Sequence, residues 1–294
     1  MRFADFQLDF SDPRNAASVN DVIEEFGGTP LHIAAWFGRL SFANTLIDMG
    51  ADIDAKTKVA SHMTSHYMSL CTPLQLAAWM GHVNLVLHLL ERGACIDETN
   101  GSGYTALHLS AANDRHFVTR ALLKRGASVD SRSIAGMTPL LSAGREGSTS
   151  ALRLLLSSGA EVDAVDLQGY TPLHFTAGNG DFACTDSLLE AGAGIHRRDG
   201  EGDTPLAWAA WHGHSMVVDQ LLRRGSECDS KNEDGTTSLM WTVHNGHIDT
   251  ANLLLERGAD VHLVDVHGWS ALHRAARDGD LDLVQLLLNR SGSL

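Results

Sequence analysis

The chain has 294 residues, and its composition, 44% hydrophobic and 20% charged, is typical of a folded protein and excludes a disordered one. Acidic residues outnumber basic ones by 36 to 22, and the net charge of −14 argues against a nucleic-acid partner, which needs a positive face. No apolar run is long enough to span a membrane, and Asp5 and Asp9 stand where a secretory signal needs an apolar core. The four cysteines form no close pair, which suits a reducing compartment. We therefore expect an intracellular protein, cytoplasmic or nuclear, with neither a nucleic-acid nor a membrane partner.

The first residues precede the repeating part of the chain. Apolar residues recur at helical spacing in residues 15–26, among them Val19, Ile23 and Phe26. We expect residues 1–26 to form an N-terminal extension whose amphipathic helix caps the open edge of the first repeat.

From residue 27 onward, one sequence unit recurs. Its marker is a threonine, replaced by serine in the last copy, and the markers from Thr72 onward lie 33 residues apart. The eight markers are Thr29, Thr72, Thr105, Thr138, Thr171, Thr204, Thr237 and Ser270. The first interval is ten residues longer than the others, which places an insertion at residues 57–71. A fixed period of this length is typical of a solenoid.

One copy, GYTPLHFTAGNG at residues 169–180, shows the structure that each unit predicts. Thr171 is the expected N-cap of a short helix, and Pro172 occupies the first helical position, where its missing N–H costs nothing. His174, three residues after the cap, can reach back to it as in a capping box. A second helix then ends near Gly192. A helix pair this short cannot bury its own apolar face, so we expect the copies to stack.

These residues resemble the ankyrin repeat, whose pattern the stretches GGTPLHIAAWFG, GYTPLHFTAGNG and LLLERGADV closely match. The resemblance covers residues 27–290, and residues 291–294 would form a tail. It implies an all-α repeat solenoid of eight ankyrin repeats. Each would be a helix–turn–helix unit with a β-hairpin-like turn, stacked in a curved, right-angled, L-shaped array. Asp114 departs from the pattern where a helix-ending glycine is expected, which bears on one helix and leaves the fold unchanged.

The insertion at residues 57–71 is polar, and we interpret it as a surface loop. His62, His66 and Cys71 offer an alternative, because the His-x3-His spacing can place two metal ligands on one helical face. The stretch lacks a nearby acidic residue and is rich in serine and threonine. We therefore expect no metal and no cofactor.

Histidines recur at two fixed positions of the unit, three residues after the cap and just before the second helix. The first set is His32, His108, His174 and His273, and the second is His82, His214 and His247. We interpret both sets as structural, since a catalytic histidine is needed once. No phosphate-binding loop, nucleophile elbow or zinc-protease motif occurs. The sequence therefore predicts no enzyme and no catalytic residue.

The resemblance implies a concave groove. In related proteins, the residues seven and eight positions after the cap point into it, together with the residue before the cap, and hold partners. The groove candidates of this chain are Trp36, Phe37, Trp79, Met80, Tyr104, Arg145, Tyr170, Trp211, His212 and Trp269. The first four form an apolar patch on neighbouring repeats, and such patches mark contact surfaces.

The stretch GDTPLAWAAWHGH, residues 202–214, concentrates tryptophans and histidines. We expect Trp208 to pack inside the stack against Trp241, its equivalent in the next repeat. Trp211 and His212 are groove candidates instead. On this interpretation Trp208 belongs to the core, Trp211 and His212 belong to the groove, and His214 is a structural histidine of the repeat. The stretch then holds no shared site.

We interpret the chain as a non-catalytic ankyrin-repeat scaffold that mediates protein–protein interaction by binding another protein through its concave groove. We expect it to be a monomer. The alternative is the sensing or targeting ankyrin segment of a larger multidomain protein whose activity lies outside this chain.

Overall fold

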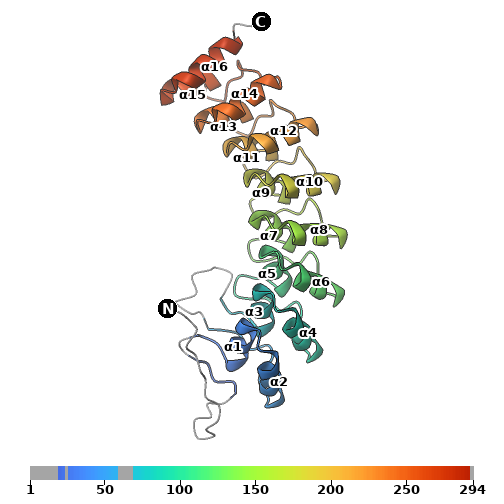
Figure 1. Ribbon diagram of the computed structural model, residues 1–294. Coiled ribbons are helices and arrows are strands. Elements are labelled where there is room, and N and C mark those ends of the chain that lie inside the picture. The colour runs from blue at the N-terminus through green and yellow to red at the C-terminus, as the bar shows by residue number, and fades with distance from the viewer. Residues whose placement is uncertain (1–18, 24–25, 59–68, 292–294) are drawn as a thin grey trace.

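The computed structural model describes residues 19–23, 26–58 and 69–291. Across these ranges the chain forms helix pairs that stack in chain order into one elongated array, with odd-numbered helices along one side and even-numbered helices along the other (Figure 1). The first helices of the pairs are α1 (Pro30–Phe37), α3 (Pro73–Met80), α5 (Ala106–Ala112), α7 (Pro139–Glu146), α9 (Pro172–Gly178), α11 (Pro205–Trp211), α13 (Ser238–His244) and α15 (Ala271–Asp278). The second helices are α2 (Leu40–Asp48), α4 (Val83–Glu91), α6 (His116–Lys124), α8 (Thr149–Ser157), α10 (Phe182–Glu190), α12 (Ser215–Arg223), α14 (Ile248–Glu256) and α16 (Leu281–Ser291). The prediction of an all-α repeat solenoid is confirmed.

Each odd-numbered helix starts as the repeat pattern predicts. Thr171 has extended backbone angles and its Oγ1 accepts a hydrogen bond from the N–H of His174, 3.4 Å away. Pro172 follows at the first helical position. The N-cap of the second helix of the same repeat is Asp181, whose carboxylate accepts a hydrogen bond from the N–H of Cys184. Local capping thus fixes both helix starts before any packing is considered.

The apolar core runs through the whole stack. Small and medium side chains, such as Ala177 and Leu188 of one repeat, are fully buried, and one cluster of buried residues extends from Phe26 to Leu287. Because each helix pair buries its apolar face against its neighbours, the core is continuous along the array. Within the described ranges, no helix combines the length and the apolar character needed to cross a membrane.

The N-terminal segment differs from the predicted helix over residues 19–23, where the structure has a turn and an isolated antiparallel bridge between Ile23 and Gly28. The side chain of Asn20 contacts the first repeat, donating to Gly50 O and accepting from the N–H of Asp52. These hydrogen bonds to a loop replace the intrahelical bonds that the apolar spacing predicted. Residues 1–18 and 24–25 lie outside the described residues.

The insertion is described only in part, and His62 and His66 lie outside the described residues. Cys71 is fully buried, and burial raises the pKa of its thiol to about 11. Its N–H donates to Thr57 Oγ1. Among the described residues, no group of three or more potential ligands could hold a metal ion. Cys71 therefore belongs to the core of the stack.

Three of the four histidines in the first set join neighbouring repeats. Nδ1 of His108 accepts the N–H of Thr105 at 3.1 Å, so that Nε2 carries the proton and donates to Met137 O of the next repeat at 2.9 Å. His32 and His174 make the same two contacts, the latter to Asp203 O at 3.1 Å. Each imidazole thus caps its own helix and holds the residue before the next cap.

The second set of histidines joins repeats in the opposite direction. His82, His214 and His247 each point Nε2 at a backbone carbonyl of the preceding repeat, at 2.9 Å. The carbonyls belong to Trp36, Gly178 and Trp211. The interpretation of both histidine sets as structural therefore agrees with these contacts.

Asp114 takes the left-handed conformation expected of the missing glycine, with φ of 50°. Its carboxylate accepts a hydrogen bond from the N–H of Ala151 in the next repeat at 2.8 Å. This hydrogen bond to a backbone donor offsets part of the cost of the strained conformation.

Replacing His108 tests the joint between repeats. We expect His108→Ala to lower the free energy of unfolding by about 2–4 kcal/mol, because it leaves a buried N–H and a buried carbonyl without partners. His108→Gln is the matched control, since Gln75 makes the same contacts in the second repeat, accepting from the N–H of Thr72 and donating to Tyr104 O. Urea unfolding of both variants measures this difference. Equal losses in the free energy of unfolding would contradict the bridging role of His108.

The pH dependence of stability follows from the same residues. Burial lowers the pKa of His32 and His108 from the ordinary 6.5 to about 4, and lowers the pKa of His174 as well. Between pH 6.5 and 4 these histidines bind protons in the unfolded chain and stay neutral in the folded chain. The free energy of unfolding is therefore highest above pH 6.5 and falls toward pH 4. We expect the free energy of unfolding of His108→Gln, measured by urea titration at each pH, to fall less between pH 6.5 and 4. An unchanged dependence on pH would contradict a buried neutral imidazole at His108.

Candidate functional site

The inner face, as we call the surface of the odd-numbered helices and of the turns that join the repeats, carries the ten groove candidates. At its N-terminal end Trp36, Trp79 and Met80 are half-buried, and Phe37 is 39% exposed. Tyr104 is only 7% exposed and packs in a small cluster of the core. Of the four residues of the predicted apolar patch, Phe37 is exposed and the other three are half-buried.

Farther along the chain, Arg145 is exposed next to Glu146, and Trp269 is 38% exposed. The guanidinium of Arg277 lies 5.8 Å from the ring centroid of Trp269. Trp211 is 40% exposed. The remaining candidates, Tyr170 and His212, lie with Trp211 around one pocket.

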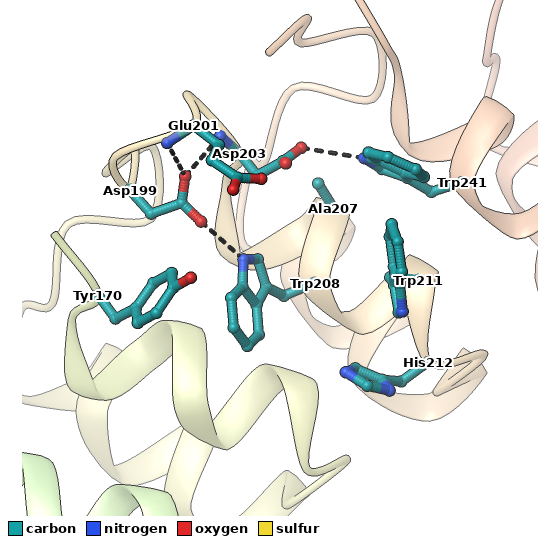
Figure 2. Close-up of a pocket in the computed structure, with 9 residues that line it drawn as sticks. All are labelled: Tyr170, Asp199, Glu201, Asp203, Ala207, Trp208, Trp211, His212 and Trp241. Atoms are coloured by element: carbon teal, nitrogen blue, oxygen red, sulfur yellow. Dashed lines mark hydrogen bonds between the residues drawn. The ribbon is translucent and has the colours of Figure 1, made fainter. Parts of the chain in front are cut away.

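This aromatic pocket has a volume of about 210 Å³ and lies between α11, α13 and the turns that precede α9 and α11 (Figure 2). It is lined by Tyr170, Asp199, Glu201, Asp203, Ala207, Trp208, Trp211, His212 and Trp241. Aromatic rings form its sides, and three carboxylates lie along one edge (Figure 2). It combines the flat apolar surfaces and the charge of a recognition site.

Trp208 forms one wall of the pocket. Its Nε1 donates to Asp199 Oδ2 at 2.8 Å, and its ring packs edge-on against Tyr170, with 4.7 Å between centroids. Asp199 Oδ1 accepts the N–H groups of Glu201 and Asp203, which closes the turn. One carboxylate therefore both shapes the turn and orients the indole.

Trp211 forms the opposite wall and packs against Trp241, with 4.3 Å between ring centroids. Trp241 Nε1 donates to Asp203 Oδ1 at 3.0 Å. The expectation that Trp208 packs against Trp241 was wrong, because each indole is directed by the carboxylate of a different residue in the turn. Trp208, Trp211 and His212, which the sequence assigned separately to the core and to the groove, line one pocket.

Gly178, the last residue of α9, makes room for this arrangement. A Cβ atom at this position would lie 2.8 Å from Trp208 Cε3, closer than carbon atoms pack. Equivalent positions in other repeats carry large side chains, including Trp36 and Trp211. The absence of a side chain in the fifth repeat thus lets the Trp208 ring of the sixth repeat lie over α9.

The electrostatics of the pocket are those of partly buried carboxylates. Asp203 is only 8% exposed, and burial together with Asp199 and Glu201 raises its pKa, against the hydrogen bond from Trp241. Burial and the same acidic cluster raise the pKa of Tyr170. Burial lowers the pKa of His212, and the neighbouring histidines add to this. The pocket therefore favours a positive ligand and keeps its imidazole neutral.

The comparisons with known proteins bear on these repeats. A family model of ankyrin repeats in three copies matches residues 74–166, 143–232 and 212–293, and a model of the single ankyrin repeat matches residues 26–58. This chain belongs to the ankyrin repeat family. Ankyrin repeats are generally protein–protein interaction modules.

The fold is also that of a solved ankyrin structure. The crystal structure of the human ASB11 ankyrin repeat domain superposes with a TM-score of 0.68 at 27% sequence identity. The match covers 76% of this chain and 99% of that chain. No curated protein matches the chain in sequence.

Asp203 precedes the cap Thr204 and so occupies a groove position of the repeat pattern. Five pocket residues lie outside the groove positions of this ankyrin array, and they are Asp199, Glu201, Ala207, Trp208 and Trp241. A spacing signal was present, because Asp199 and Trp208 are nine residues apart and so are Asp265 and Arg274, which form an ion pair at 2.7 Å in the last repeat. A turn carboxylate therefore pairs with the donor nine residues later.

Enlarging Gly178 tests how the pocket is built. We expect Gly178→Ala to push the Trp208 ring away from Asp199 and to change the near-ultraviolet circular dichroism of the tryptophans. Gly144→Ala is the matched control, because a Cβ atom there would meet Pro172 O at 3.3 Å. Identical spectra for wild type and Gly178→Ala would contradict the packing of Trp208 over α9.

Proposed function

We propose that this chain is a non-catalytic scaffold that binds another protein through the concave groove formed by its inner face. The observation that carries the proposal is the aromatic pocket on that face, with Trp211 40% exposed at its rim. Exposed tryptophans beside a pocket are enriched at binding hot spots, because a large rigid ring loses little entropy on contact.

The contact is centred on the sixth and seventh repeats rather than on the N-terminal patch. In that patch, the ring centroids of Trp36 and Phe26 lie 6.3 Å apart, and the ring of Trp79 packs against the core. Phe37 and Met80 extend the same inner face and would contact a longer partner segment. The groove therefore has one deep anchor site and a shallower continuation.

The absence of catalysis is supported by the state of the reactive side chains. His32, His108 and His174 use both ring nitrogens in hydrogen bonds between repeats. Burial raises the pKa of the Cys184 and Cys228 thiols to about 12, which removes the thiolate that a nucleophile needs. The monomeric state, the intracellular location and the alternative of a segment of a larger protein stay predictions.

Site-directed photo-cross-linking tests the groove. A benzophenone amino acid is placed at Phe37 or His212 on the inner face, and at Met49 or Met216 as controls. Both methionines belong to the second half of a repeat and are exposed, at 67% and 72%. We expect a partner captured from an extract of the source organism to cross-link from the inner positions. Cross-links from the two methionine positions alone would contradict the groove.

A further inference from the structure

We propose that the aromatic pocket binds the side chain of an arginine in the partner protein, with the guanidinium between the indole walls and the carboxylates. The inference rests on the proposed function, and it adds the chemistry of the group that is recognised. Its residues are Tyr170, Trp208 and Trp211 as walls, with Asp199, Glu201 and Asp203 along the edge (Figure 2).

The walls suit a flat cation. Trp208 and Trp211 come from one turn of α11 and face the pocket from opposite sides (Figure 2). Indole faces attract cations through their quadrupole, and a planar guanidinium can stack on them while it donates in its own plane. The indole N–H groups of Trp208 and Trp241 are already bonded to carboxylates, so a ligand meets ring faces and acceptors here.

The carboxylates are not neutralised within the protein. Asp199 and Asp203 accept hydrogen bonds from backbone N–H groups, indoles and the Asn232 amide, all of them uncharged. In the described part of the chain, neither residue forms an ion pair, and the same holds for the exposed Glu201. The nearest basic residue in sequence, Arg198, donates to backbone carbonyls of Gly202 and Lys231.

A neutral ligand would fit this edge poorly. Asp203 is nearly buried, and an apolar side chain in the pocket would remove its remaining water without supplying a donor. A guanidinium instead offers five N–H donors and a positive charge, which offset that loss. The pocket thus discriminates by charge as well as by shape.

The last two repeats already contain the proposed interaction. The guanidinium of Arg274 lies 5.7 Å from the ring centroid of Trp241 and pairs with Asp265 at 2.7 Å. Arg274 occupies the repeat position of Trp208, so the eighth repeat supplies its own cation to an indole and a turn carboxylate. The sixth repeat has the indole and the carboxylates and lacks the arginine, which a partner would provide.

Indole N–H signals in two-dimensional NMR test the proposal on the intact chain, which has six tryptophans. Single Trp→Phe variants assign the signals. We expect N-acetyl-arginine-methylamide to shift the signals of Trp208, Trp211 and Trp241 in a saturable way, and to leave Trp36 and Trp79 unmoved. The citrulline analogue, which has nearly the same shape without the charge, should produce no saturable shift.

Two variants separate the charge of the pocket from the charge of the whole chain. Glu201→Gln should weaken arginine binding about threefold, the scale of one exposed ion pair. Asp234→Asn, at the equivalent position of the next turn, removes the same charge outside the pocket and should leave binding unchanged. Equal weakening by both variants would refute recognition at the pocket.

Three results would overturn the proposal. These are equal shifts with citrulline, a stronger response to the lysine analogue or its trimethylated form, and no movement of the three indoles. Failure of the arginine proposal is distinct from failure of the groove proposal, since a protein that does not bind arginine would still give cross-links from His212. Cross-links from the methionine positions alone would refute the groove even if arginine moved the indoles.

Discussion

The hydrogen bond from the side chain three residues after one cap to the carbonyl before the next cap joins the first, second, third and fifth repeats to the repeats that follow them. Each unit has two short helices and buries its apolar face only against its neighbours, so the relative placement of repeats decides the core. His174 donates to Asp203 O at 3.1 Å, and the side chain of Asp203 in turn orients Trp241. The contact that aligns the fifth and sixth repeats therefore also places a carboxylate at the edge of the pocket.

The architecture could be predicted because it is encoded locally and repeatedly. A threonine cap followed three residues later by histidine specifies a helix start wherever it occurs, and the regular period specifies the stack. The helix predicted over residues 15–26 had only apolar spacing to support it and lacked a repeated cap. In the structure, Asn20 bonds to Gly50 and Asp52 of the first repeat, and residues 19–23 form a turn and a bridge. Tertiary contacts there override a weak local pattern.

Only part of the pocket could be predicted from the sequence, because the directions of some side chains depend on contacts with residues far away in the sequence. The repeat register placed Trp211 and His212 on the inner face, since that depends on helix phase alone. The direction of the Trp208 ring depends on a hydrogen bond to Asp199 and on the missing side chain of Gly178 in the preceding repeat. Those features lie in three different parts of the sequence, and neither helix phase nor composition connects them.

The most direct test of the account is hydrogen exchange of the full chain with and without the bound partner segment. The turn at residues 199–203 and the end of α11 form the edge and one wall of the pocket, so their amides report on contact there. The account predicts that exchange slows in this turn and at the end of α11, while the even-numbered helices keep their free rates. Slowed exchange confined to the even-numbered helices would contradict it.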